Sequence, residues 1–193
     1  MGILKIKKRH LSYAMSKAHE DPALKTPWQE RGDAARLQEH YRKIWKKMGI
    51  RVKYRRTTRG KFANLTTTYY SRILLSKAYV KSDSTWQAAT DAHETIHARQ
   101  WRTLGRVKFA ARYAFSSRWR WAIEMQAYCE SIRALYAQGA SEATLKAYID
   151  RRSMVFKRFY AMRAIKFSSL EKWTRQILED ALSRVKKEHA KLR

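Results

Sequence analysis

The sequence predicts an α+β protein that is mostly helical, with a small antiparallel sheet of about three strands ahead of a central helix and a helical C-terminal half. Apolar residues recur at steps of three and four over most of the chain, which is typical of amphipathic helices. Residues 50–80 differ, because Ile50, Val52 and Tyr54 alternate with basic residues and Thr, Tyr, Ile and Leu are frequent. With 193 residues and a 45% hydrophobic share, the chain can build one packed core.

Residues 1–25 are predicted to form a basic N-terminal arm. A helix should begin after Thr26, because Thr26 can cap it, Pro27 suits the first helical position and Gln29 stands at capping-box spacing. Apolar residues then follow a helical period as far as Gly49, a natural end for a helix.

The predicted sheet lies between residues 50 and 80. Its first strand has a basic face formed by Arg51 and Lys53, and residues 58–61 suggest a hairpin turn. Residues 62–80 should hold two further strands, the last near Tyr70–Val80.

Helices are predicted for the rest of the chain. Asp83 and its serine neighbours can cap the central helix, and Gly105 should end it. A short helix follows as far as Ser116, a longer one ends near Gly139, and two more occupy residues 141–193.

Residues 93–97 read His-Glu-Thr-Ile-His, and two histidines four positions apart lie on the same face of a helix. His93 and His97 can therefore offer two imidazoles to one metal ion, while Glu94 can reach a water bound to that ion. This is the arrangement of zinc peptidases, in which the glutamate is the general base. The stripe from Trp86 to Leu104 places both histidines on the inward face, so two core histidines with other partners remain the alternative.

Glu124 lies on the inward stripe of the next long helix, three residues after Trp121 and four before Tyr128. A carboxylate on such a face is unfavourable unless it is paired or bound to a cation. We expect Glu124 to be the third ligand of a Zn²⁺ ion with one open position. The alternative is a buried ion pair with an arginine.

The order of helix, small sheet, His-Glu-x-x-His helix and Glu-x-x-Ala helix resembles the minimal gluzincin peptidases, SprT-type and ImmA/IrrE-type proteins among them. In that family the third ligand often begins a Glu-x-x-Ala segment, which residues 124–127 match. The last strand before the active helix borders the substrate cleft there and pairs with the substrate backbone, and Ser71–Val80 holds that place. Asp91 and Arg99 depart from the pattern, because zinc-peptidase helices usually have uncharged residues at these positions.

This resemblance covers roughly residues 27–136. It implies a zincin-like metallopeptidase core at residues 26–140, with residues 141–193 as a basic helical extension packed on it. Glu94 would transfer a proton from water to the leaving amine of a protein or peptide substrate. Tyr113, Tyr128 and Arg118 are candidate donors to the developing oxyanion.

The formal net charge of +27 predicts a polyanionic partner, and nucleic acid is the usual one. No sequence-reading motif is present, so we expect binding through phosphates that is non-specific and salt-dependent. The residues expected to contact nucleic acid are Arg51, Lys53, Arg55, Arg56, Arg59 and Lys61. A second hypothesis follows: a catalytically inactive, DNA-facing structural component of a virion or another nucleoprotein assembly.

One cysteine, Cys129, excludes an internal disulfide framework and fits a reducing compartment. No run of 18 apolar residues and no apolar signal-peptide core is present, so no membrane partner is expected. These features predict a cytoplasmic protein associated with nucleic acid or with a virion.

Overall fold

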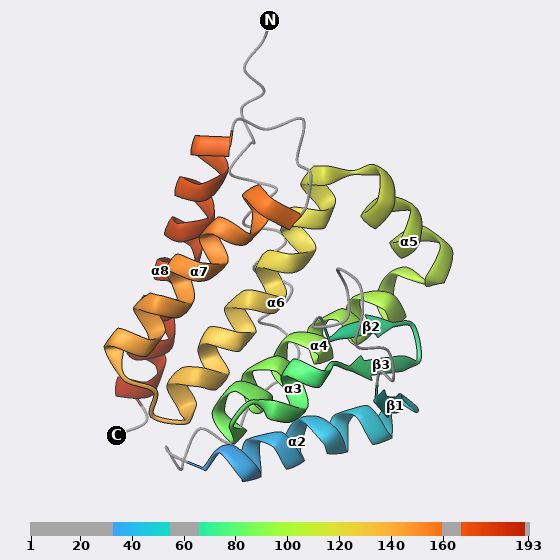
Figure 1. Cartoon of the computed structure of the whole chain (residues 1–193), viewed down its shortest axis with the longest axis horizontal. Helices are drawn as coiled ribbons and strands as arrows, with labels where there is room; N and C mark the ends of the chain where they lie inside the picture. Colours follow the sequence, from blue (N-terminus) through green and yellow to red (C-terminus); the bar gives the residue numbers. More distant parts are fainter. Residues whose placement is uncertain (1–32, 55–65, 160–166, 192–193) are drawn as a thin grey trace, which may run out of the picture.

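The computed structural model describes residues 33–54, 66–159 and 167–191, which form a mostly helical α+β fold (Figure 1). The predicted fold class is confirmed. The predicted arm at residues 1–25 lies outside the described residues. In chain order the elements are α2 (Ala34–Lys47), β1 (Arg51–Tyr54), β2 (Thr67–Tyr69), β3 (Arg72–Leu75), α3 (Lys77–Lys81), α4 (Ser84–Leu104), α5 (Arg106–Phe115), α6 (Ser117–Ala137), α7 (Glu142–Phe159) and α8 (Phe167–Ala190).

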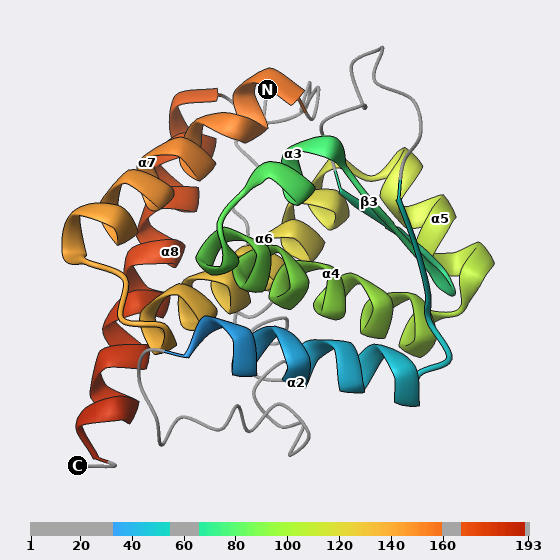
Figure 2. The ribbon, with the colours of Figure 1, turned by 60° about the horizontal axis from the view of Figure 1, so that its bottom comes forward.

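Helix α4 is the central element and lies between α2 and α6 (Figure 2). Asp83 caps it by accepting a hydrogen bond from the backbone N–H of Trp86, and Gly105 ends it with a φ of 75°. Small side chains let α4 and α6 approach closely, and the Ser131 hydroxyl donates to the Ala89 carbonyl across the gap at 3.0 Å. The buried alanines of the two helices are Ala88, Ala89, Ala92, Ala98, Ala127 and Ala134.

Helix α2 covers the other side of α4, and it begins later than the sequence suggested. The predicted start after Thr26 is wrong for this helix, because Asp33 accepts from the Arg36 backbone N–H and caps α2 directly before Ala34. Its buried aromatic residues are fixed by polar contacts. The Tyr41 hydroxyl donates to Glu130 at 3.0 Å, and the indole N–H of Trp45 donates to Thr95 at 2.7 Å.

The sheet is mixed, with strand order β1-β3-β2. β2 pairs with β3 in antiparallel register, as predicted, but β1 runs parallel to β3, so a wholly antiparallel sheet was wrong. The last strand is also shorter than the predicted Tyr70–Val80. Ser76 accepts from the Tyr79 backbone N–H and begins α3, which outweighs the strand preference of Tyr79 and Val80.

Because β3 is the central strand, both of its edges are already paired among the described residues. The expectation that Ser71–Val80 pairs with a substrate backbone is therefore wrong. The edge strand nearest to α4 is β2.

Helices α7 and α8 pack on α6 on the far side from the sheet (Figures 1 and 2). They share the largest apolar cluster with α4 and α6, in which Ile132, Leu145 and Leu178 are fully buried. The indole N–H of Trp121 donates to Thr174 on α8 at 3.0 Å. Across the part of the chain that the structure describes, no helix is long and apolar enough to cross a membrane.

Replacing Asp83 with alanine should weaken the start of α4. The backbone N–H of Trp86 would lose its acceptor, and loss of such a cap costs about 1 kcal/mol of unfolding free energy. Urea denaturation followed by circular dichroism measures this. Asp83→Asn, which retains a capping oxygen, should stay close to wild type, and an equal loss in both variants would contradict the capping role.

Candidate metal centre

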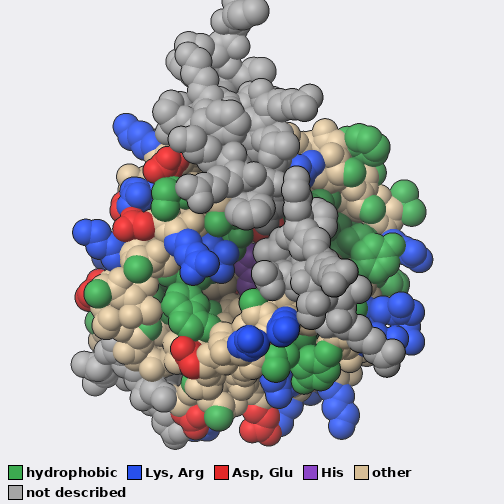
Figure 3. Space-filling model, in the orientation of Figure 1, with side chains coloured by type: hydrophobic (Ala, Val, Ile, Leu, Met, Phe, Trp, Pro, Cys, Tyr) green, Lys and Arg blue, Asp and Glu red, His purple; other side chains and the backbone are tan. Residues whose placement is uncertain are grey.

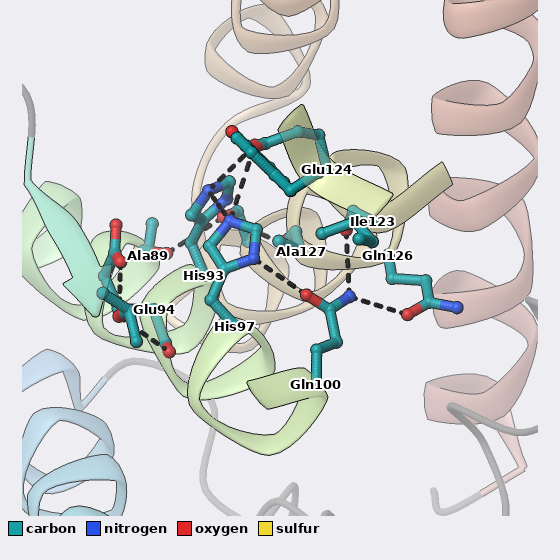
Figure 4. A network of polar contacts seen from close by, with 12 residues as sticks. Ala89, His93, Glu94, His97, Gln100, Ile123, Glu124, Gln126 and Ala127 are labelled. Atoms are coloured by element: carbon teal, nitrogen blue, oxygen red, sulfur yellow. Dashed lines mark hydrogen bonds and ion pairs between the residues drawn. The ribbon is translucent and has the colours of Figure 1, made fainter. Parts of the chain in front are cut away.

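Three side chains from α4 and α6 meet at one point (Figure 4). The Nε2 atoms of His93 and His97 lie 3.0 Å apart. Oε2 of Glu124 lies 3.4 Å from Nε2 of His93 and 3.5 Å from Nε2 of His97. The structure thus brings together the three predicted ligands, and this group could hold a metal ion.

These distances suit a tetrahedral cation. Ligand atoms about 2.1 Å from a tetrahedral centre lie ~3.4 Å from one another. The two imidazole-to-carboxylate separations match that edge length, and the imidazole pair is a few tenths of an ångström closer. Three such atoms occupy one face of a tetrahedron and leave the fourth position open.

The two oxygens of Glu124 have different environments. Oε1 accepts a hydrogen bond of 2.7 Å from the Tyr113 hydroxyl. Oε2 is buried, faces the imidazoles and has no hydrogen-bond partner in the described structure. In the absence of a metal this oxygen has only the ion pairs with the two imidazoles, and a cation between the three groups would bind it directly. The donor set therefore fits a metal.

The protonation states of His93, His97 and Glu124 depend on one another. Burial lowers the pKa of both imidazoles, but the Glu124 carboxylate outweighs burial at His97 and raises its pKa to about 9. Burial also opposes the charge of Glu124, but the imidazoles hold its pKa well below its usual range. The centre without metal thus carries one imidazolium beside a carboxylate.

Gln100 orients His97. Its amide nitrogen donates to the Ile123 carbonyl at 3.1 Å and to Gln126 at 2.8 Å, so its carbonyl oxygen must face His97. That oxygen lies 2.8 Å from Nδ1 of His97. Nδ1 therefore carries the proton, and Nε2 is left to face Glu124 as a ligand.

Glu94, the predicted general base, lies on the side of the imidazoles that faces the sheet (Figure 4). Its carboxylate accepts a hydrogen bond of 2.7 Å from the hydroxyl of Thr68 on β2, and the same hydroxyl lies 3.3 Å from the Glu94 carbonyl. This contact joins the edge strand β2 to helix α4. It holds a buried carboxylate beside the metal ligands without binding it to them.

The centre is enclosed but can be reached from outside. The side chains of His93 and His97 retain 14% and 10% of their exposure. In Figure 3 a small area of histidine surface is visible near the middle of the face shown. A ligand can therefore approach the imidazoles from solvent.

Asp91 and Arg99 are the two residues that differ from the zinc-peptidase pattern. Asp91 is a buried carboxylate. It is 0% exposed, and Tyr79 on α3 and Arg42 on α2 both act to lower its pKa against the effect of burial. Burial raises its pKa to about 7, and its nearest cation, Nε of Arg42, lies 3.7 Å away. Asp91 thus faces α2 and α3, on the far side of the motif helix from Glu124.

The structure separates the three candidate oxyanion donors. The Tyr113 hydroxyl is used to hold Glu124. Tyr128 packs its ring against His93, with the centroids 4.7 Å apart. Arg118 is exposed in the first turn of α6. Tyr113 is therefore a positioning residue for the third ligand.

Sequence reasoning did not find Gln100, the role of Tyr113 or Thr68. Gln100 stands three residues after His97 on the same helical face, so its spacing could have indicated the contact. The contacts of Tyr113 and Thr68 join separate elements, and no spacing reveals them.

The predicted nucleic-acid residues are only partly described. Arg51 and Lys53 are exposed on β1, two positions apart and so on one face of the sheet. Arg55, Arg56, Arg59 and Lys61 lie outside the described residues.

Comparison of the chain with protein-family models, with curated proteins and with solved structures gives no match.

Cation binding should release a proton. Because the pKa of His97 is raised to about 9, its imidazole is protonated at neutral pH and must lose that proton to act as a ligand. Apparent zinc affinity should rise about tenfold per pH unit between about pH 6.5 and 8.5 and level off above the pKa. Calorimetric titration at several pH values measures this.

The matched variants are His97→Ala, which should abolish the site, and His40→Gln on α2, which should leave it intact. Affinity that did not change with pH would contradict the assigned protonation state.

Gln100→Leu should weaken metal binding by about 10- to 100-fold, because His97 would lose the acceptor that fixes its ring and tautomer. Competition with a chromophoric chelator gives the affinity. Gln176→Leu, at an exposed glutamine on α8, is the control and should bind as wild type. Equal affinity in all three proteins would remove Gln100 from the centre.

Proposed function

We propose that the protein is a zinc-dependent peptidase of the gluzincin type. The observation that carries this proposal is the convergence of His93, His97 and Glu124 around one open position, with the Glu94 carboxylate held beside them. Two imidazoles and one carboxylate with a free fourth position form the donor set of catalytic rather than structural zinc. Bound there, zinc would supply Lewis acidity. It would lower the pKa of a water molecule, which makes that water a better nucleophile toward a carbonyl carbon, and it would polarise the carbonyl.

Glu94 is the proposed general base. Its carboxylate is not part of the ligand group, and its one described side-chain hydrogen bond, from Thr68, leaves the other oxygen free to accept a proton from the attacking water. The proton would then pass to the leaving amine. Thr68 fixes the carboxylate during both transfers.

The edge strand β2 is the proposed place for an extended substrate. It carries Thr68 and is an outer strand of the described sheet, whereas β3 is paired on both sides. A peptide that added to this edge would gain backbone hydrogen bonds and run past Glu94.

The second candidate is the inactive structural component of a nucleoprotein assembly. The net charge of +27 supports an association with nucleic acid in either case. The observation that favours the enzyme is the open fourth position beside the Glu94 carboxylate, because structural zinc sites are closed by a fourth protein ligand.

Glu94→Gln should reduce peptide hydrolysis by about 10²- to 10⁴-fold while zinc binding is retained, because the base is removed and the ligands are not. The assay incubates zinc-loaded protein with a proteome-derived peptide library and identifies new termini by mass spectrometry. Glu39→Gln, at an exposed glutamate on α2, is the control and should cleave as wild type.

Two outcomes would decide against the peptidase. Full turnover by zinc-loaded Glu94→Gln would remove the assigned base. Wild-type protein that binds zinc at His93, His97 and Glu124 but cleaves nothing in the library would favour the structural role.

A further inference from the structure

Two long segments of the chain contain no acidic residue. Residues 40–82 hold 13 Lys and Arg, residues 95–123 hold another 7, and neither segment has an Asp or Glu. They include the whole sheet and α5, which lie together on one side of the molecule (Figures 1 and 2). On the right-hand side of Figure 3, where these elements lie, basic and hydrophobic side chains are intermixed and no acidic side chain is visible.

The outer face of the sheet carries a row of three exposed residues. Arg51, Arg72 and Tyr69 are partners in register across β1, β3 and β2, so their side chains project from the same face. The two arginines stand on neighbouring strands, and no ion pair joins either one to a described carboxylate. Like charges placed opposite each other repel, so this row favours an anion between them.

Tyr70, at the β2–β3 turn, lies next to Tyr69 at the end of this row. Tyr69 and Tyr70 are 52% and 47% exposed, although both contact the buried ring of Trp101 edge-on, at centroid distances of 5.5 and 6.4 Å. Arg106 at the start of α5 lies 5.7 Å from the Tyr69 ring and donates to its hydroxyl at 3.3 Å. Trp101 and Arg106 thus hold the rings in place, while about half of each tyrosine remains exposed to solvent.

Tyr70 has an unfavourable backbone. Its φ is 51°, and it is the one non-glycine residue with a positive φ in the described structure. A two-residue turn of this kind favours Asn or Gly, and a bulky residue there is strained. An exposed aromatic ring kept at such a position points to a use for the ring outside the fold.

We propose that this surface, formed by Arg51, Tyr69, Tyr70, Arg72 and Arg106, binds single-stranded nucleic acid. The three arginines would contact phosphates, and the two tyrosine rings would stack on bases. Stacking on exposed rings requires unpaired bases, so a single strand fits this surface better than a duplex. The inference stands apart from the proposed peptidase, because none of the five residues belongs to the metal centre.

The test uses the full-length protein and a 5′-fluorescein-labelled oligothymidylate of about 20 nucleotides, with anisotropy measured from about 50 to 200 mM NaCl. Tyr70→Asn should weaken binding about 5- to 100-fold with an unchanged salt slope, because stacking is lost and phosphate contacts are kept. Its melting temperature should stay close to that of wild type, because Asn tolerates a positive φ and this gain offsets the loss of the Trp101 contact. Arg72→Gln should instead flatten the logarithmic salt slope by about 0.7.

Arg151→Gln is the matched charge control, because Arg151 is exposed on α7, across the molecule from the sheet. It should keep the wild-type salt slope. His97→Ala should also bind the oligonucleotide as wild type, so that failure of the peptidase and failure of this surface can be told apart.

Three results would overturn the proposal. Tyr70→Asn could bind as tightly as wild type, or Arg151→Gln could flatten the slope as much as Arg72→Gln, which would indicate diffuse charge attraction. Phosphatidylserine vesicles could bind in a Tyr70-dependent manner while oligonucleotide binding was unaffected, which would assign the surface to a membrane.

Discussion

The close packing of α4 on α6 is the constraint on which the centre depends. Alanines on both helices are almost fully buried where the helices meet, and Ser131 joins the backbones there. Side chains as short as these allow two helices to lie near enough for a glutamate of one to reach imidazoles of the other. A larger side chain at Ala127, which packs against Ile96, would separate Glu124 from the histidines before it affected any ligand directly.

The buried Asp and Glu side chains contrast with the strongly basic composition of the chain. In the part of the chain that the structure describes, four acidic side chains, Asp91, Glu94, Glu124 and Glu130, are buried on α4 and α6, while the net charge of the chain is +27. Buried carboxylates are costly unless a cation or donor balances each one. Tyr41 and Arg133 balance Glu130, Thr68 donates to Glu94, and a metal would balance Glu124.

Much of this arrangement could be predicted from local patterns. The four-residue spacing placed both imidazoles on one helical face, and the inward stripe of the next long helix singled out Glu124. Capping residues located the start of α4 and the break at Ser116, because caps act over three or four residues. The sequence also placed Arg51 and Lys53 on one side of a strand.

What local patterns missed depends on contacts between distant segments. The parallel pairing of β1 with β3 depends on the path of the chain rather than on the composition of either strand. The start of α2 was missed because Asp33 caps it in place of the equally plausible Thr26. Tyr113 and Thr68 reach the centre only after α5 and β2 have packed against the helices that carry the ligands.

Trp101 lies between the candidate metal centre and the surface formed by Arg51, Tyr69, Tyr70, Arg72 and Arg106. It lies four residues after His97, one turn or ~6 Å along α4, and supports both tyrosines of the β2–β3 turn. A nucleic-acid strand bound to those rings would hold other proteins on the same strand near the open coordination position. Their effective concentration at that position would be high. Under the two proposals made above, the peptidase would cleave proteins because they are bound to the same strand, with little need to recognise a particular peptide.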